Sequence, residues 1–502
     1  MKPIYSFLYF ILLNTSILCQ SSINSSELLT TLLNADGINN EEELKSFEKI
    51  YSEILLESKN EVEDEENIYD KHKVLFKLLH SEFLKKYKFE AYINKLFKGK
   101  EFNCATAVVL YQMICLDLGL NINLYETPYH VFITALNPGK QNFTIELTDP
   151  VDGFDAKLDN SEYIEYLIDY KFITEDELKE KGEEAIYKEF ISETHQISVN
   201  ELIAIYYTNL ASFNVRNDST LKAYRFIKKA VMLSQDSLKI KTHNLIWYFH
   251  TENIKSDVDI YSNFLIENLD SIPVSIEFYN QMIYSAAIAV DLNMDNNSFD
   301  VAENIFNKLC DVLPKNMLKE NSISRIEINI KTNKAHNKII RGNNDEAFII
   351  AGDLYRKYKE NDKILDLYLY CGNTYMQKLG LNRNTSKLLE VADSMFANAP
   401  NVKSVEDSYV MACVQNAINS GLYLTDPHKS KEILLSANKK LPDNAGICSS
   451  IGYVYHEMAM AEIRNRNYKK AIDILNEGLE YDPNSHDLKR EIILTKELLN
   501  KR

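Results

Sequence analysis

The feature that most constrains the fold is a helical pattern that recurs in the C-terminal part of the chain. In each set, small and apolar residues lie on one face of a helix. A proline twelve residues after the first alanine ends two of the sets, at Pro314 and Pro483. One helix pair cannot bury its apolar face alone, so the pairs are predicted to stack into a superhelix with a concave surface. The sets are Ala223, Ile227, Ala230; Ala302, Phe306, Leu309; Ala347, Ala351, Leu354; and Ala471, Leu475, Gly478.

Composition supports a mostly helical protein. Only 14 Gly and 10 Pro occur in 502 residues, which favours long helices over a sandwich or barrel. The length suggests two to four domains. The formal net charge of −17 disfavours a phosphate-binding surface, so no nucleic-acid partner is expected.

The first 19 residues are predicted to be a secretory signal peptide. Lys2 precedes an apolar run over residues 4–13, and small and polar residues follow. The chain is therefore expected to be exported, to a periplasm or to the extracellular medium. Lipid attachment at Cys19 is an alternative, but Leu18 is larger than lipoprotein processing usually accepts. No later segment is apolar enough to span a bilayer, so no integral membrane segment is expected after signal removal.

Three further regions are predicted after the leader. Residues 20–70 read as a helical segment interrupted by the acidic run Glu61–Glu66, which is predicted to be a solvated linker. Residues 71–197 contain the segments that carry chemistry, and residues 198–502 contain the helical repeats.

The chemistry-bearing region opens with Asn103, a good helix N-cap, followed by an uninterrupted helical pattern over Cys104–Leu118 that ends at Gly119. Cys104 is thus predicted in the first turn of a helix. There the macrodipole and the unpaired N–H groups favour a thiolate over a thiol.

A histidine and an aspartate follow on predicted strands, over residues 122–126, 129–136 and 143–148. If the six turn residues 137–142 are shared symmetrically, His130 falls opposite Asp149 on one face of a hairpin. Glu146 would then lie opposite Ile133, on the other face. A one-residue slip reverses this preference.

Cys104, His130 and Asp149 together suit nucleophilic thiol catalysis, with His130 as base and Asp149 as its orienting partner. Each residue alone has a simpler interpretation, His130 as a core residue and Asp149 as the opening of a turn. The other cysteines after residue 19 show no zinc spacing, and no metal or cofactor is predicted.

Three segments surround these residues: Phe102–Ala107, Tyr125–Phe132 and Ile145–Pro150. They resemble the signature segments of transglutaminase-like, papain-fold cysteine proteins, most closely bacterial members that join this domain to tetratricopeptide repeats. The resemblance covers roughly residues 75–157, and the last unit, around Ala471, resembles a tetratricopeptide repeat. It implies an α+β papain-like domain followed by an all-α superhelix, with Cys104 as nucleophile, His130 as general base and Asp149 as orienter. Asn103 replaces the glutamine that precedes the family's cysteine and is the oxyanion candidate. Val131 replaces the aromatic residue that often follows the family's histidine.

Two functions follow as hypotheses. The first is an exported thiol hydrolase or acyltransferase that acts on peptide or protein amide bonds, with the repeats binding a protein or peptide. The second is a non-catalytic tetratricopeptide scaffold whose transglutaminase-like domain is structural or silent.

Overall fold

The structure is a computed structural model that describes residues 23–127, 130–156, 164, 168, 174–190, 194–269, 275–422 and 426–500. The chain forms two compact units, Met1–Ser285 and Ala286–Arg502. The predicted leader and Cys19 lie outside the described residues. Within the described residues, none of the helices combines the length and apolar character that crossing a membrane needs.

The described part of the first unit begins with four helices: α2 (Ser25–Ala35), α3 (Glu41–Glu63), α4 (Ile68–Glu82) and α5 (Ile93–Gly99). Helix α3 continues through Glu61–Glu63, so the predicted acidic linker is shorter than expected. Asn24, Asn40 and Asn67 cap the first three helices by accepting backbone N–H bonds.

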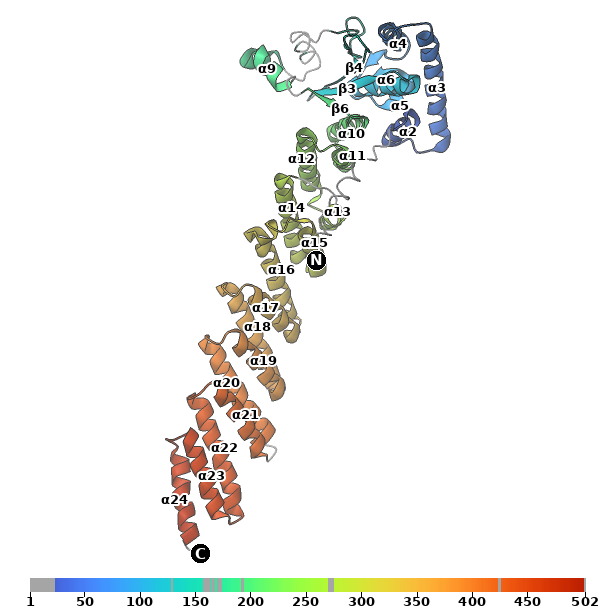
Figure 1. Ribbon diagram of the computed structural model, residues 1–502. Helices are drawn as coiled ribbons and strands as arrows, with labels where there is room; N and C mark the ends of the chain where they lie inside the picture. The colour runs from blue at the N-terminus through green and yellow to red at the C-terminus, as the bar shows by residue number, and fades with distance from the viewer. Residues whose placement is uncertain are drawn as a thin grey trace, which may run out of the picture. The chain divides into compact units, whose positions relative to one another are not determined.

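Helix α6 (Cys104–Leu118) has the bounds predicted from the sequence, with Asn103 as N-cap and Gly119 in the left-handed conformation (φ +68°). Every residue from Ala105 to Cys115 is buried. A helix that is apolar on all sides belongs inside a domain. Figure 1 shows α6 surrounded by the strands and by α2 to α5.

A four-stranded antiparallel sheet packs beside α6, in the order β5-β4-β3-β6. Its strands are β3 (Ile122–Thr127), β4 (His130–Ala135), β5 (Phe143–Ile145) and β6 (His195–Ile197). The sequence did not predict β6. A separate two-stranded parallel sheet joins β1 (Lys86–Tyr87) to β2 (Glu101–Phe102).

The predicted hairpin register is wrong by one residue. Ala135 pairs with Phe143 and Ile133 with Ile145, so the connection has seven residues, not six. Within this connection, the backbone N–H of Lys140 donates to the carbonyl of Asn137, which makes the turn asymmetric. A one-residue shift exchanges the two faces of a strand. The shift decides which carboxylate can reach His130.

Helices α8 (Glu175–Lys181) and α9 (Glu183–Phe190) precede β6, and α10 (Val199–Arg216) starts a continuous series of helices. The next three are α11 (Thr220–Leu233), α12 (Ser237–Ile254) and α13 (Val258–Asn268). These four helices belong to the first compact unit. Tyr206 of α10 anchors the series, because its hydroxyl accepts the N–H of Ile93 at 2.8 Å and donates to Asp36 at 2.5 Å.

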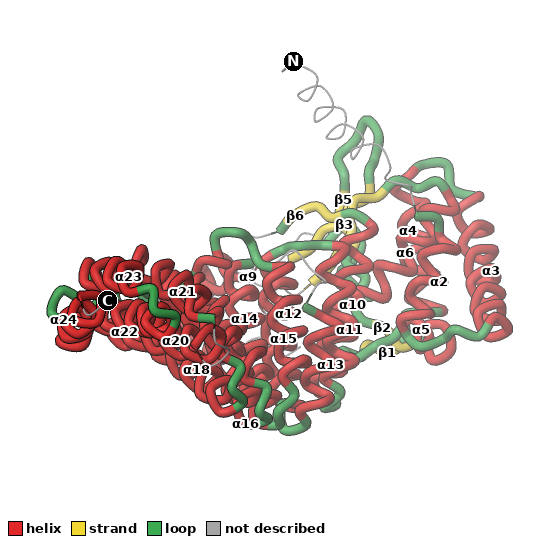
Figure 2. The backbone as a smooth tube through the Cα atoms, turned by 90° about the horizontal axis from the view of Figure 1, so that it is seen from below, coloured by secondary structure: helices red, strands yellow, loops and turns green. Residues whose placement is uncertain are grey.

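In the described part of the second unit, all regular elements are helices, which Figure 2 draws in red. Figure 1 shows α22, α23 and α24 side by side. Helix α14 (Ile276–Asp295) spans the division between the units. The helices that follow are α15 (Phe299–Val312), α16 (Asn321–Ile340), α17 (Asn344–Lys357), α18 (Asp362–Leu381), α19 (Thr385–Asn398), α20 (Lys403–Ala417), α21 (Pro427–Lys440), α22 (Ala445–Arg464), α23 (Tyr468–Tyr481) and α24 (His486–Asn500).

The helices recur as pairs, as in the predicted tetratricopeptide repeats. The second helices of four successive pairs begin at Asn344, Thr385, Pro427 and Tyr468, which lie 41 or 42 residues apart. A tetratricopeptide unit has about 34 residues. The difference arises largely because first helices such as α18 and α22 have 20 residues.

One turn joins the two helices in several pairs. A left-handed residue follows the first helix, and the next N–H bonds back to a carbonyl five residues earlier, as Asn384 does to Leu379. This geometry reverses the chain in a few residues. The left-handed residues are Asp218, Asn297, Gly342, Arg383 and Arg466.

Small buried residues lie on the helices of the second unit. Ala347, Ala351 and Ala471 are fully buried, as the recurring pattern predicts. Cβ of an alanine at Gly478 would lie 2.9 Å from Cβ of Tyr455 on the preceding helix. The sequence pattern therefore marks the contacts between helices.

Candidate functional site

Cys104 is the first residue of α6 and is partly exposed. The Asn103 side chain accepts the N–H of Thr106 at 3.0 Å, and the Thr106 hydroxyl accepts the N–H of Asn103 at 2.9 Å. This reciprocal cap fixes the start of the helix, and with it the position of the thiol.

Asn103 was the predicted oxyanion donor, but its carboxamide has other partners. Its amide nitrogen donates to the carbonyls of Phe89 at 3.0 Å and Ala91 at 3.4 Å. The Asn103 side chain thus caps α6 and also binds the preceding segment at Phe89 and Ala91.

His130 begins β4 and contacts two chemically active partners. Its Nε2 lies 2.5 Å from Oε2 of Glu146, and it also forms a hydrogen bond with Cys104. Burial lowers the pKa of His130, but the Glu146 carboxylate and the bond with Cys104 outweigh it and raise the pKa to about 10.

Glu146 is itself held by a neighbour. Its Oε1 accepts both the N–H and the hydroxyl of Thr148, at 2.8 and 2.5 Å. Burial raises the pKa of Glu146, whereas the charge of His130 and these hydrogen bonds lower it, and the net shift is downward. Glu146 is therefore a carboxylate fixed on both oxygens.

Asp149, the predicted partner of His130, lies in a turn after β5. Its Oδ1 accepts the N–H groups of Val151 at 2.9 Å and Asp152 at 3.1 Å. The structure thus brings together Cys104 and His130 as predicted, but places Glu146 on the histidine in place of Asp149. The register shift explains the difference. Thr148, which donates two hydrogen bonds to Oε1 of Glu146, is a signal for the position of Glu146 that sequence reasoning did not use.

A cavity of about 330 Å³ opens beside the thiol, within the first unit. Cys104, His130 and Val131 line one side, and residues of α10 and α12 line the other. The latter are Ile205, Thr208, Asn209, Ser212, Arg216, Leu238, Lys239 and Thr242. Helices placed in the predicted repeat region thus help to form the cavity.

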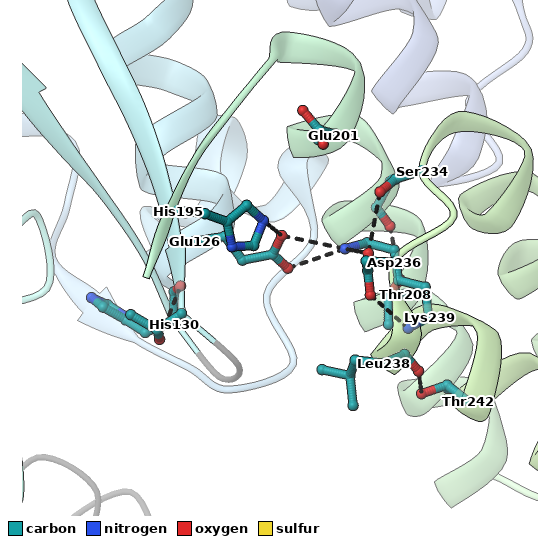
Figure 3. A network of polar contacts seen from close by, with 12 residues as sticks. Glu126, His130, His195, Glu201, Thr208, Ser234, Asp236, Leu238, Lys239 and Thr242 are labelled. Carbon is teal, nitrogen blue, oxygen red and sulfur yellow. Dashed lines mark hydrogen bonds and ion pairs between the residues drawn. The ribbon is translucent and has the colours of Figure 1, made fainter. Parts of the chain in front are cut away.

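Lys239 ties α12 to β3 at this cavity, as Figure 3 shows. Its ammonium group lies 3.1 Å from Oε1 of Glu126 and 2.5 Å from Oδ2 of Asp236, and its side chain is only 2% exposed. On the adjacent strand β6, Nε2 of His195 lies 3.7 Å from Oε2 of Glu126. Sequence reasoning missed this buried network, because nothing in the spacing of Glu126 and Lys239 links them.

The remaining described cysteines are unpaired, and they offer no second thiol centre. Cys115, Cys371 and Cys413 are buried, whereas Cys310 and Cys448 are partly exposed. In the part of the chain that the structure describes, no cluster of His, Cys, Asp or Glu could hold a metal ion.

Comparisons with known proteins add likenesses among solved structures only, since no family model and no curated protein matches the chain. The P58(IPK) TPR domain is 13% identical, with 68% of this chain and 98% of that chain covered and a TM-score of 0.18. Yeast Tom70 is 14% identical, with 68% and 60% covered and a TM-score of 0.17. The APC/C hetero-tetramer Cut9-Hcn1 is 16% identical, with 59% and 50% covered and a TM-score of 0.16.

Proposed function

We propose that the chain is a thiol hydrolase or acyltransferase that acts on amide bonds, and that its helical repeats bind a protein or peptide partner. The supporting observation is that His130 contacts both Cys104 and Glu146, and that Cys104 and His130 line a cavity. A charged histidine between a thiol and a buried carboxylate suits both proton donation and thiol activation.

In the proposed acylation step, the Cys104 thiolate attacks the carbonyl carbon, a C–S bond forms, and the carbonyl electron pair moves onto oxygen. Backbone N–H groups at the start of α6 stabilise that oxyanion. When the intermediate collapses, the C–N bond breaks and His130 gives its proton to the departing amine. The product is a thioester on Cys104.

In the second step, water or another amine attacks the thioester and His130 accepts its proton. The C–S bond breaks, a carboxylic acid or a new amide leaves, and the thiolate returns. Glu146 keeps the imidazole oriented and balances its charge throughout. The resemblance of the three signature segments to transglutaminase-like proteins supports this reaction class.

The test is site-resolved alkylation of the full chain with iodoacetamide at pH 7. Cys448, which is partly exposed and lies in the second unit, serves as an internal reference. We expect Cys104 to react at least about tenfold faster than Cys448, and His130→Ala to remove the advantage. Equal rates for the two cysteines would reject the enzyme proposal. In parallel, wild-type protein and Cys104→Ser are compared for amine release from a peptide mixture.

A second candidate function is a protein-binding scaffold without catalysis. In each of α18, α20, α22 and α24, a large apolar residue is exposed eight positions after the first residue of the helix. These residues are Tyr370, Met411, Tyr453 and Leu494, with exposed fractions of 49%, 46%, 57% and 43%. Tyr370 and Met411 also line one cavity of about 550 Å³. Repeated exposed apolar side chains suit a partner surface.

The scaffold is tested by changing all four residues to serine. We expect proteins that copurify with both wild type and Cys104→Ser to be lost from this variant. If the same proteins remain bound, the four residues do not form the partner surface.

A further inference from the structure

The charged side chains around the Cys104 cavity differ in how well they are compensated. Lys239 contacts two carboxylates, and His130 contacts Glu146. Arg216 has a looser arrangement: its Nη1 lies 3.8 Å from Oε1 of Glu90, and the two side chains are 59% and 41% exposed. An ion pair this exposed contributes little stability, so the guanidinium remains able to bind another anion.

Arg216 is also well positioned for binding. It is the last residue of α10 and lines the same cavity as Cys104 and His130. Its exposure places it toward the solvent side of the cavity. The guanidinium carbon lies 4.5 Å from the centre of the Phe89 ring, which also lines the cavity. A planar guanidinium held against an aromatic ring can present two parallel N–H donors to a carboxylate.

We propose that the Cys104 cavity takes an acyl donor that carries a free carboxylate, and that Arg216 binds this carboxylate. The inference rests on the proposed thiol chemistry and names its substrate class. The cavity volume of about 330 Å³ is near the lower end for ligand sites, which suits a small acyl donor or the end of a peptide. Ile205 and Leu238 also line the cavity and give it apolar surface.

The experiment compares carboxylate and carboxamide forms of one thiol reagent on the full chain. The reagents are 3-maleimidopropionate and 3-maleimidopropionamide, with the 6-maleimidohexanoate pair as a longer version. In each case the thiolate adds across the maleimide double bond, one C–S bond forms, and a proton from water completes the product. The chemistry at sulfur is therefore the same, and the ratio of the two rates at Cys104 reports the effect of the carboxylate.

Three substitutions make the test specific. Arg216→Gln should lower the carboxylate-to-carboxamide ratio about threefold or more for at least one reagent length. Lys222→Gln removes the same charge from an exposed position that does not line the cavity, and should leave the ratio unchanged. Glu90→Gln removes the carboxylate that competes for Arg216 and should raise the ratio.

An unchanged ratio in Arg216→Gln at both lengths would overturn the inference, as would an equal loss in Lys222→Gln. The carboxamide rate tests the proposed function separately, because it depends on Cys104 and His130 and not on a carboxylate. The ratio can be measured even if Cys104 is only as reactive as Cys448. The two proposals can thus fail independently.

Discussion

Oε2 of Glu146 lies 2.5 Å from Nε2 of His130, and both side chains are largely shielded from solvent. This contact makes Glu146, and not Asp149, the carboxylate that orients the histidine. We therefore expect Glu146→Gln to slow the alkylation of Cys104 about tenfold or more, because an amide cannot balance the imidazolium charge. Asp149→Asn is the matched control and should stay close to wild type. Equal effects of the two substitutions would argue against this assignment.

The charge on His130 should persist well into the alkaline range. Because its folded pKa of about 10 exceeds the ordinary value of 6.5, the imidazolium should stay protonated at pH 8. The ¹⁵N chemical shifts of the His130 ring across pH measure this directly. Glu146→Gln should bring the titration back toward neutral pH. A wild-type midpoint near 6.5 would contradict the assignment.

The same pKa shifts predict how stability depends on pH. His130 has a raised pKa, so its contribution is complete below pH 6.5 and is lost as the pH rises toward 10. Glu146 has a lowered pKa, so its contribution is present above pH 4.5 and is lost as the pH falls through the lowered value. The pair should thus stabilise the fold most between about pH 4.5 and 6.5.

Trp247 provides the readout for this dependence, since it is the single tryptophan and is buried in the first unit. We expect the urea midpoint of wild type to exceed that of the double variant His130→Gln/Glu146→Gln by more at pH 6 than at pH 9.5. A difference that does not change between these pH values would contradict the prediction.

Much of the site could be predicted from the sequence, and the parts that could not have definite causes. Asn103, Cys104 and Gly119 carry local signals for the start and end of a helix, so α6 was predicted with its correct bounds. The partner of His130 depends on the number of residues in a turn, and one extra residue exchanged Asp149 for Glu146. The contact between Glu126 and Lys239 joins positions distant in sequence, and no local pattern predicts such a pair.

The repeats show the same division between local and distant information. Buried alanines marked several helix pairs, whereas units such as α19 and α21 have Leu388 and Ser430 at the equivalent buried place. The alanine pattern therefore missed them. The left-handed turn residues were also not predicted, because residues such as Arg383 are not glycine and residue type alone does not indicate a positive φ.

Lys239 should be essential to the stability of the first unit. Lys239→Met leaves Glu126 and Asp236 without their shared cation, and we expect a loss of about 3 kcal/mol in the free energy of unfolding. Trp247 fluorescence in urea measures it. Lys241→Met, on an exposed position of the same helix, should have little effect. Adding Glu126→Gln and Asp236→Asn should restore part of the loss; no restoration would show that charge pairing is not the cause.

Gly153 should be required for the position of Glu146. Cβ of an alanine there would lie 2.1 Å from the Glu146 carbonyl oxygen and 2.3 Å from that of Asp149, so the backbone would have to move. We expect Gly153→Ala to slow Cys104 alkylation. Gly99→Ala is the control, because its nearest neighbour would be a side-chain carbon of Glu101 at 3.8 Å. Similar alkylation rates for the two variants would show that the loop does not position Glu146.

The central claim is that Cys104, His130 and Glu146 act as one unit, and a double-mutant cycle tests it most directly. The measurement is the rate of Cys104 alkylation by iodoacetamide in wild type, His130→Ala, Glu146→Gln and the double variant. If Glu146 acts through His130, Glu146→Gln should slow wild type about tenfold but have no further effect once His130 is alanine. Equal slowing in both backgrounds would contradict the account.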